Sequence, residues 1–173
     1  MIKVTCLGAA GSVTGSNYLV ETGRGKQIII DCGLFQGGRQ MEARNWLPWD
    51  FNPREVEAVL LTHAHLDHSG RLPKLVKDGF RGQIIASPPT VDLCKIMLLD
   101  SAHIQEMEAE WQNRKNRRQQ HKQVVPLYTT EDAQECIDYL RPQETDRSFD
   151  VCPGVEARFK NAGHILGSCI LEL

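Results

Sequence analysis

Residues 60–70, LLTHAHLDHSG, gather side chains that bind metal ions directly after an aliphatic run. His63, His65, Asp67 and His68 lie within six positions. Imidazole nitrogens and carboxylate oxygens are common zinc ligands, and a zinc site takes about four of them. The adjacent side chains of Asp67 and His68 rarely converge with two others on one ion. The pattern therefore predicts two ions, the first held by His63 and His65 and the second by Asp67 and His68.

Two metal ions in one site favour hydrolysis of a phosphate or acyl ester. A pair about 3.5 to 4 Å apart can bridge a hydroxide and bind both the attacking and the departing oxygens. A lone histidine is more often a satisfied polar residue than a ligand. Four ligand types in the order H-x-H-x-D-H after a buried strand nevertheless favour a metal site.

Two residues outside this motif are candidates for the same site. His164, in NAGHILGS, would complete the ligand set of the first ion. Asp31 ends the run QIIID, where it either caps a turn or accepts a hydrogen bond from a metal-binding histidine, and we favour the second role. The glycine-rich GAAGSVTGS lacks the G-K-[ST] ending of a phosphate-binding loop, so it is interpreted as a tight connection near the site.

Short β-branched runs predict the strands that position these residues, and longer amphipathic stretches predict helices. The expected strands are 2–7, 16–22, 26–31, 56–62 and 82–87, with further strands in 154–173. The expected helices are 69–79, 88–122 and 129–140, and the apolar face of the second is expected to hold Val91, Cys94, Ile96, Met97 and Leu98. This order favours a layered α/β domain, with the histidine motif in the loop after strand 56–62 and the turn before His68 supplied near Gly70.

Composition is that of an ordinary soluble globular domain. The 173 residues are 41% hydrophobic and 24% charged with a net charge of -2, which gives no overall attraction to nucleic acid or membrane. No run reaches the roughly 18 apolar residues of a membrane span, and no signal peptide is evident, so we expect a cytoplasmic protein. The six cysteines lack any C-x-x-C pair and are expected to be reduced and mostly buried.

The motifs THAHLDHSG, IIIDCG and GHILGS resemble the metallo-β-lactamase superfamily. GAAGSVTGSNYLVET, DCGLFQGG and LLDSAHIQEMEAEWQNRKNRR resemble its β-CASP branch of RNA-processing nucleases. The resemblance implies an αββα sandwich and a zinc-dependent endoribonuclease on single-stranded RNA, with exonuclease activity as a second capacity. It places His63, His65 and His164 on one zinc, and Asp67 and His68 on the other with catalytic roles. Asp31 would support them.

The chain departs from that family pattern after His164. Only ILGSCILEL follows, so the aspartate that bridges both metals in the family is absent, as are the β-CASP insert and a terminal histidine. Glu172 is a poor replacement because it lies within a strand. We therefore interpret residues 1–173 as the N-terminal part of a metallo-β-lactamase domain, with the first sheet and part of the second. Exposed sheet edges predict self-association, as in a homodimer, or partial disorder, and the second zinc site is expected to fill less readily.

The stretch WQNRKNRRQQHK contains the candidate RNA contacts Arg114, Lys115, Arg117 and Arg118, although a charge run is usually a solvated face. His103 and His121 are assigned to the surface or to local packing. Two alternatives stay open beside the ribonuclease. One is a hydrolase of a small ester, thioester or lactam, and the other is a non-catalytic scaffold for RNA processing.

Overall fold

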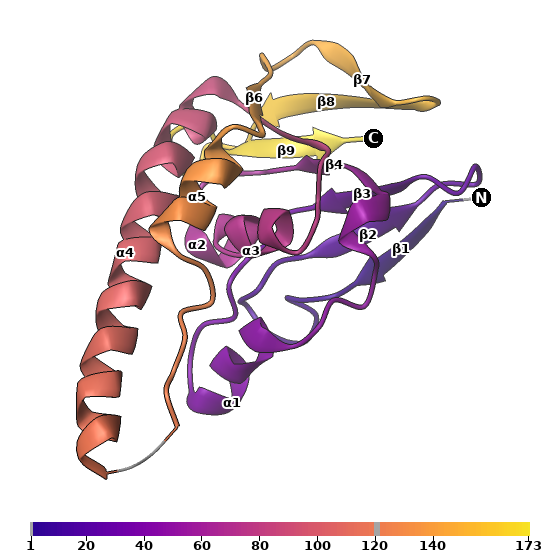
Figure 1. Ribbon diagram of the computed structural model, residues 1–173. Coiled ribbons are helices and arrows are strands. Elements are labelled where there is room, and N and C mark those ends of the chain that lie inside the picture. The colour runs from indigo at the N-terminus through magenta and orange to yellow at the C-terminus, as the bar shows by residue number, and fades with distance from the viewer. Residues whose placement is uncertain (1, 120–121) are drawn as a thin grey trace.

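A computed structural model describes residues 2–119 and 122–173, and for residues 118 and 119 it describes the helical backbone alone. The described residues form three layers, one of helices and two of sheet (Figure 1). These are one α layer and both β layers of the expected αββα sandwich, so the predicted fold class is confirmed.

The larger sheet has six strands in the order β1-β2-β3-β4-β5-β6. Its strands are β1 (Lys3–Cys6), β2 (Tyr18–Glu21), β3 (Gln27–Ile30), β4 (Val56–Leu60), β5 (Gln83–Ala86) and β6 (Leu140–Pro142). The pairs β1·β2 and β2·β3 are antiparallel, whereas β3, β4, β5 and β6 run parallel. The carboxyl ends of β3, β4 and β5 therefore meet at one edge, and the loops that follow them lie side by side.

The smaller sheet is antiparallel, in the order β7-β8-β9. Its strands are β7 (Ser148–Cys152), β8 (Val155–Asn161) and β9 (Cys169–Glu172). It packs on one face of the larger sheet, where Ala157 and Phe159 meet Ala58 and Leu60 in a shared apolar cluster. The turn between β8 and β9 is thereby carried to the larger sheet, and it contains His164.

Helices cover the opposite face of the larger sheet. They are α2 (Leu66–Ser69), α3 (Leu72–Lys77), α4 (Pro88–Gln119) and α5 (Thr130–Ile137). The connection between β3 and β4 contains a further short helix, α1 (Arg39–Glu42), and two 3-10 turns, η1 (Ala43–Trp46) and η2 (Pro53–Glu55). Val59 and Ile84 point into this layer, toward Leu75 and Leu98. Because the central strands are buried on both faces, they have the nearly continuous apolar sequences that predicted them.

Several expected boundaries were wrong. The expected helix 69–79 is split into α2 and α3 at Gly70 and Arg71, and β6 and β7 were not among the expected strands. Ile96 is 69% exposed, so it does not belong to the buried face of α4, while Val91, Cys94 and Leu98 do. His121 lies outside the described residues. Five of the six cysteines are buried and none is paired, as expected; Cys6 is exposed.

Within the described residues, no helix has the length and the apolar character needed to cross a bilayer.

Candidate metal centre

The histidine motif begins at the carboxyl end of β4 and turns into α2 without a linker. His65 is the N-cap of α2, and its carbonyl accepts hydrogen bonds from the amides of His68 and Ser69 at 2.9 Å each. The turn therefore begins at His65, earlier than the expected turn at Gly70. His63 precedes the turn in extended chain, whereas Asp67 lies on the helix.

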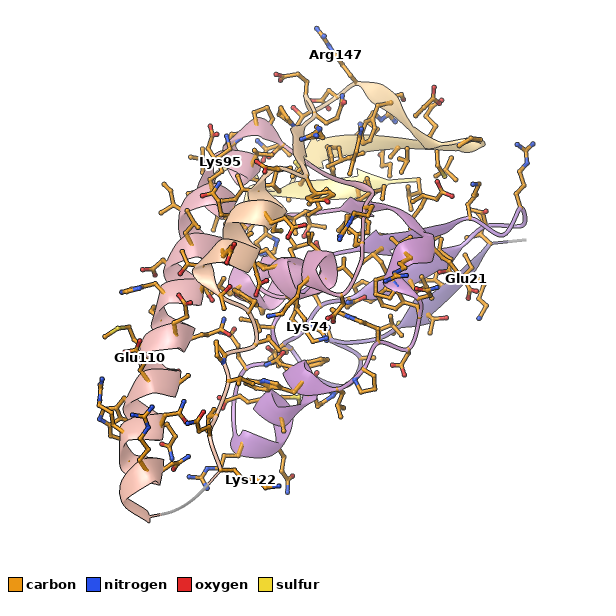
Figure 2. All side chains as sticks on the ribbon, viewed as in Figure 1. Glu21, Lys74, Lys95, Glu110, Lys122 and Arg147 are labelled. Carbon is orange, nitrogen blue, oxygen red and sulfur yellow. The ribbon has the colours of Figure 1, made fainter. Side chains whose placement is uncertain are left out.

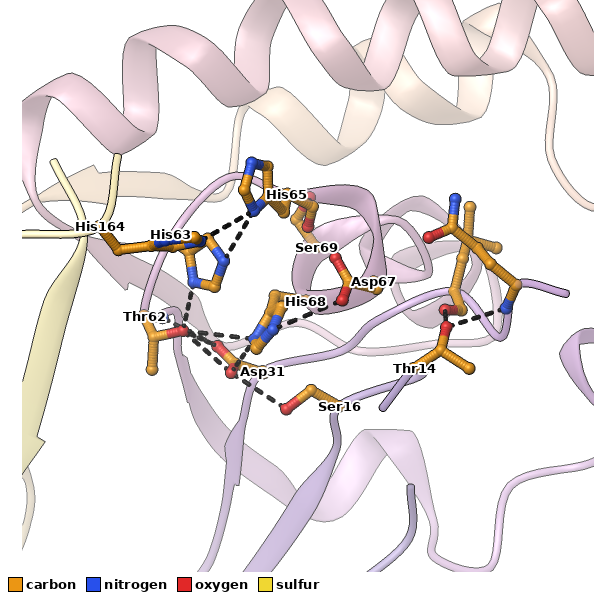
Figure 3. Close-up of polar contacts among 12 residues, drawn as sticks. Thr14, Ser16, Asp31, Thr62, His63, His65, Asp67, His68, Ser69 and His164 are labelled. Carbon is orange, nitrogen blue, oxygen red and sulfur yellow. Dashed lines mark hydrogen bonds and ion pairs between the residues drawn. The ribbon is translucent and has the colours of Figure 1, made fainter. Parts of the chain in front are cut away.

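Three histidines converge at the edge between the two sheets (Figure 3). His63 Nε2 lies 3.1 Å from His65 Nδ1, which lies 3.3 Å from His164 Nε2. One ligand atom from each residue lies within 4.8 Å of the others. His63 is buried and His164 is exposed, so one side of the cluster is open to solvent. The structure thus brings together the three residues assigned to the first ion.

This arrangement fits a metal ion by the chemistry of its donors. Three ring nitrogens face one another over these short distances, where either an N–H on one ring or a cation shared by all three satisfies their lone pairs. Zinc binds imidazole nitrogen at about 2.0 to 2.1 Å, so two ligands of a tetrahedral ion lie about 3.4 Å apart. The observed separations of 3.1 and 3.3 Å are close to that spacing. His63, His65 and His164 would hold the ion.

Asp31 organises the residues beside this cluster. It follows β3 with a backbone φ of 56°, and its buried carboxylate lies 2.7 Å from His68 Nδ1. The carboxylate also accepts hydrogen bonds from the amide and hydroxyl of Thr62, at 2.8 and 2.9 Å, and from the Ser16 hydroxyl at 3.3 Å. Because a carboxylate only accepts, His68 Nδ1 carries a proton, and Nε2 is the unprotonated nitrogen of the neutral ring.

Thr62 extends the same network to His63. Its single hydroxyl proton is donated to Asp31, so its oxygen can accept from His63 Nδ1 at 3.0 Å. That tautomer leaves the Nε2 of His63 unprotonated, facing His65. Asp31 and Thr62 together therefore present the metal-facing nitrogens of two histidines.

Asp67 and His68 form the second predicted ligand pair. His68 Nε2 lies 3.7 Å from an Asp67 carboxylate oxygen, and the His68 ring lies 4.0 Å from the His63 ring, centroid to centroid. Burial lowers the pKa of His68, but its hydrogen bond to Asp31 and the Asp31 charge outweigh burial, so the net shift is upward. The two predicted ligand sets are neighbours in space.

The pKa of His63 is shifted in the opposite direction from that of His68. Burial, and then the nearby His68, lower the pKa of His63 to about 4. His63 is consequently neutral at physiological pH and needs to lose no proton before it binds a cation.

The remaining candidates lie away from the histidines. Arg114, Lys115 and Arg117 lie on the far half of α4, where Arg114 pairs with Glu110 at 3.7 Å, and the side chain of Arg118 lies outside the described part. Figure 2 shows Glu110 and Lys122 near that end of the helix. Glu172 pairs with Arg158 at 2.6 Å in the smaller sheet. His103 is exposed on α4, as expected.

Sequence reasoning missed the hydroxyl residues that hold the site together. Thr62 and Ser16 contact Asp31, and Ser168 accepts the His164 amide at 3.0 Å. The only sequence feature that could have indicated these residues is their position, since each is within two residues of a strand end or lies in the predicted tight loop. Single hydroxyls are too common in loops for that signal to select them.

Comparisons with known proteins agree with this geometry. The family model described as "Metallo-beta-lactamase superfamily" matches residues 10–93. Among solved structures, a B3 metallo-beta-lactamase with an active-site glutamic acid superposes with a TM-score of 0.56 at 17% identity, covering 97% of this chain and 53% of that one. The Rm3 metallo-beta-lactamase gives a TM-score of 0.51 at 19% identity, covering 96% of this chain and 51% of that one. These structures share the fold.

Curated relatives match almost the whole chain. Ribonuclease TTHA0252 of Thermus thermophilus is 39% identical over 170 residues, which cover 98% of this chain and 34% of the relative. Transcription termination factor FttA of Methanosarcina mazei is 32% identical over 170 residues, covering 98% of this chain and 24% of the relative. The chain thus spans about a quarter to a third of the length of these relatives.

Proposed function

We propose that the chain is a member of the metallo-beta-lactamase superfamily, whose family model matches residues 10–93, and that it carries the metal-binding part of a hydrolase that cleaves phosphodiester bonds in single-stranded RNA. Endonucleolytic cleavage is the proposed principal activity, with exonucleolytic cleavage as a second mode. The supporting observation is the convergence of His63, His65 and His164 beside the pair Asp67 and His68. RNA as the substrate is supported by the similarity to Ribonuclease TTHA0252.

We propose two zinc ions, the first on His63, His65 and His164 and the second on Asp67 and His68. Bound zinc supplies Lewis-acid polarisation of the phosphate and makes water more acidic. The protein's own contribution is positional. Asp31 fixes the orientation of His68, and the open side at His164 admits a substrate.

Asp67 is the candidate proton acceptor. Its side chain is 28% exposed and lies beside the histidines without a lysine or arginine partner among the described residues. A carboxylate so placed can orient an attacking water and receive its proton, while His68 beside it is held by Asp31.

The basic part of α4 is proposed as a contact for the RNA backbone. Thr90, at the start of α4, contacts the loop that carries His164. Arg114 lies 24 residues further along the same helix, which separates it from Thr90 by about 36 Å. A strand stacked at about 3.4 Å per nucleotide would need about 11 nucleotides to reach from one to the other. The two regions therefore act together only on a long strand.

One experiment tests the proposed activity. The purified protein is assayed for zinc per chain and for hydrolysis of single-stranded RNA, a thioester and a lactam, beside His65→Ala and the control His103→Ala. We expect zinc binding and RNA cleavage that His65→Ala abolishes and His103→Ala retains. Hydrolysis of the thioester or lactam without RNA cleavage would favour the small-substrate hydrolase. Zinc binding without any hydrolysis would favour the scaffold.

The proposal includes a cytoplasmic location, where RNA substrates are available. It also includes self-association through sheet edges, because Ile170 on the edge strand β9 and Val4 on the edge strand β1 are 58% and 59% exposed.

A further inference from the structure

We propose that the hydroxyl groups of Ser87 and Thr90 position His164 by holding the loop that carries it. The effect of this positioning on metal binding rests on the proposed metal centre. The hydrogen bonds that hold the loop do not depend on an ion. Neither residue touches the three histidines, so both are positioning residues.

The loop from Ala162 to Ser168 has its own internal hydrogen bonds. The Ser168 hydroxyl accepts from the amides of His164 and Ile165 at 3.0 and 3.1 Å, and the Ser168 amide donates to the carbonyl of Ile165 at 3.0 Å. The Ala162 amide donates to the Ser168 carbonyl at 3.0 Å. These bonds make the loop one rigid turn, but they do not fix where the turn lies relative to the larger sheet.

The Gly167 carbonyl supplies an external anchor. The Ser87 hydroxyl lies 2.5 Å from it and the Thr90 hydroxyl 2.9 Å from it. A carbonyl oxygen has two lone pairs, so both hydroxyls can donate to it at once. Ser87 follows β5 and Thr90 is in the first turn of α4, so the anchor joins the smaller sheet to the larger sheet and to the helix layer.

This anchor is tightly packed. Ser87 and Thr90 are 2% and 0% exposed. Gly167 has a φ of +80°, and a Cβ there would lie 2.7 Å from the Thr90 amide nitrogen and 2.8 Å from the Ser87 hydroxyl. Loss of both hydroxyls would leave the carbonyl of Gly167 with a weaker donor, the Cys169 thiol at 3.3 Å. A backbone hydrogen bond from the Cys169 amide to the Thr62 carbonyl, at 2.9 Å, also joins the end of this loop to the larger sheet.

The His164 ring depends on this anchor because its own contacts are few. Among the described residues, its ring nitrogens have one hydrogen-bonding neighbour, His65 Nδ1 at 3.3 Å, and the residue is exposed. Its place beside His63 and His65 is therefore set by the backbone of the turn, which Ser87 and Thr90 hold.

The test compares Zn²⁺ affinity, measured by competition with a chromophoric chelator, for the wild type, Thr90→Val and the double variant S87A/T90V. Thr90→Ser keeps the hydroxyl and serves as the conservative rescue. The matched control is Ser101→Ala, because Ser101 is also buried on α4 and its hydroxyl bonds the Tyr128 hydroxyl at 3.0 Å, away from the histidines. The visible spectrum of bound Co²⁺ and amide hydrogen exchange of residues 163–169 in metal-free protein are the additional readouts.

We expect the double variant to bind Zn²⁺ about 10-fold to 100-fold more weakly, as do other losses of groups that orient metal ligands. Its Co²⁺ spectrum should change, and the loop amides should exchange faster even without metal. Thr90→Ser and Ser101→Ala should keep the wild-type affinity. If S87A/T90V fails to fold, Thr90→Val alone decides the question.

Unchanged Zn²⁺ affinity and unchanged loop exchange in Thr90→Val and S87A/T90V would overturn the proposal, as would an equal loss of affinity in Ser101→Ala. These results are separable from the proposed activity. Metal binding by the wild type without RNA cleavage would refute the nuclease and leave the positioning role in place. Wild-type Zn²⁺ affinity in Thr90→Val and S87A/T90V, with intact RNA cleavage, would refute only the positioning role.

Discussion

Asp31 and His68 are 37 residues apart in the sequence, yet a carboxylate oxygen of Asp31 lies 2.7 Å from Nδ1 of His68. The contact is possible because β3 and β4 are parallel neighbours whose carboxyl ends meet. Asp31 has a positive φ, which is uncommon for a residue other than glycine and turns its carboxylate into the shared edge. The bond selects the His68 tautomer that leaves Nε2 available.

Replacing Asp31 by asparagine should therefore alter His68 more than His63. Without the carboxylate charge, we expect the pKa of His68 in metal-free protein to fall, as observed by NMR titration of its ring protons. Loss of ring orientation should lower RNA cleavage by about 10-fold to 100-fold. Asp92→Asn is the control, since Asp92 is exposed and pairs with Lys95 on α4. A wild-type pKa of His68 in Asp31→Asn would contradict this role.

Much of the fold was predictable because its central strands are buried on both faces. Ile28, Val59 and Ile84 lie in apolar runs typical of a strand covered on both faces, and these runs coincide with β3, β4 and β5. In contrast, β7 contains Ser148, Phe149 and Asp150, which are exposed or half-exposed, so its sequence has no comparable apolar signal. The short β6 ends in proline, a residue that disfavours strands.

The candidate site was partly predictable for a similar reason. His63, His65, Asp67 and His68 are close in the sequence, so their spacing alone indicated a metal site. His164 needed the assumption that a distant turn returns to them. The anchor that Ser87 and Thr90 form with Gly167 could not be predicted, because it depends on how the two sheets pack, and no local sequence pattern indicates that packing.

The pH dependence of folding stability in metal-free protein should show the effect of the lowered pKa of His63. Its pKa is lowered from 6.5 to about 4 in the folded protein. As the pH falls from about 6.5 to about 4, the unfolded chain binds a proton that the folded protein does not, so folding stability is lost over this window. Urea unfolding across this range should show a shallower decline in His63→Gln than in the wild type. An equally steep decline would assign the effect to other groups.

His68 has the opposite effect on the pH dependence of folding stability. Because its pKa is raised in the fold, its stabilisation is complete below its unfolded pKa and is lost as the pH rises through the folded value. His68→Gln should accordingly lose more stability at the acidic end of the same titration than at pH 8. A constant loss at all pH values would contradict the raised pKa.

Gly167→Ala tests the crowded turn, with Gly25→Ala as the matched control. Both glycines have a positive φ, +80° and +75°, so both substitutions cost about 1 to 2 kcal/mol of folding free energy in backbone strain. A Cβ at Gly25 meets no heavy atom within 4 Å, whereas one at Gly167 meets Thr90 at 2.7 Å. We expect the larger loss of stability, and the only loss of Zn²⁺ affinity, in Gly167→Ala. Equal effects in both variants would exclude the crowding.

Neutralising Arg114, Arg117 and Arg118 should weaken RNA binding in a manner that depends on strand length. Each lost contact with a single strand lowers the slope of log affinity against log salt by about 0.7, so three lost contacts lower it by about 2. We expect this change with strands longer than about 11 nucleotides, the span estimated from α4, and little change with shorter ones. Neutralising Lys3, Lys26 and Lys95 provides the control. An unchanged slope with long strands would remove the basic end of α4 from the RNA-binding surface.

Sedimentation velocity tests the exposed strand edges. Ile170 lies on the edge strand β9 and is 58% exposed, so we expect concentration-dependent self-association that Ile170→Lys reduces. A compact monomer at all concentrations would contradict this expectation.

His65 and His164 are separated by 99 residues, and the ring contact between them closes that whole length of chain. Closing a flexible loop of about 100 residues costs about 4 kcal/mol of chain entropy, before other terms. An ion held by both residues would act as a cross-link between the sheets, much as a disulfide does. Ion binding and docking of the smaller sheet would then form one cooperative unit. By reciprocity, docking of the smaller sheet would raise the affinity for the ion by the same factor by which ion binding raises the equilibrium constant for docking.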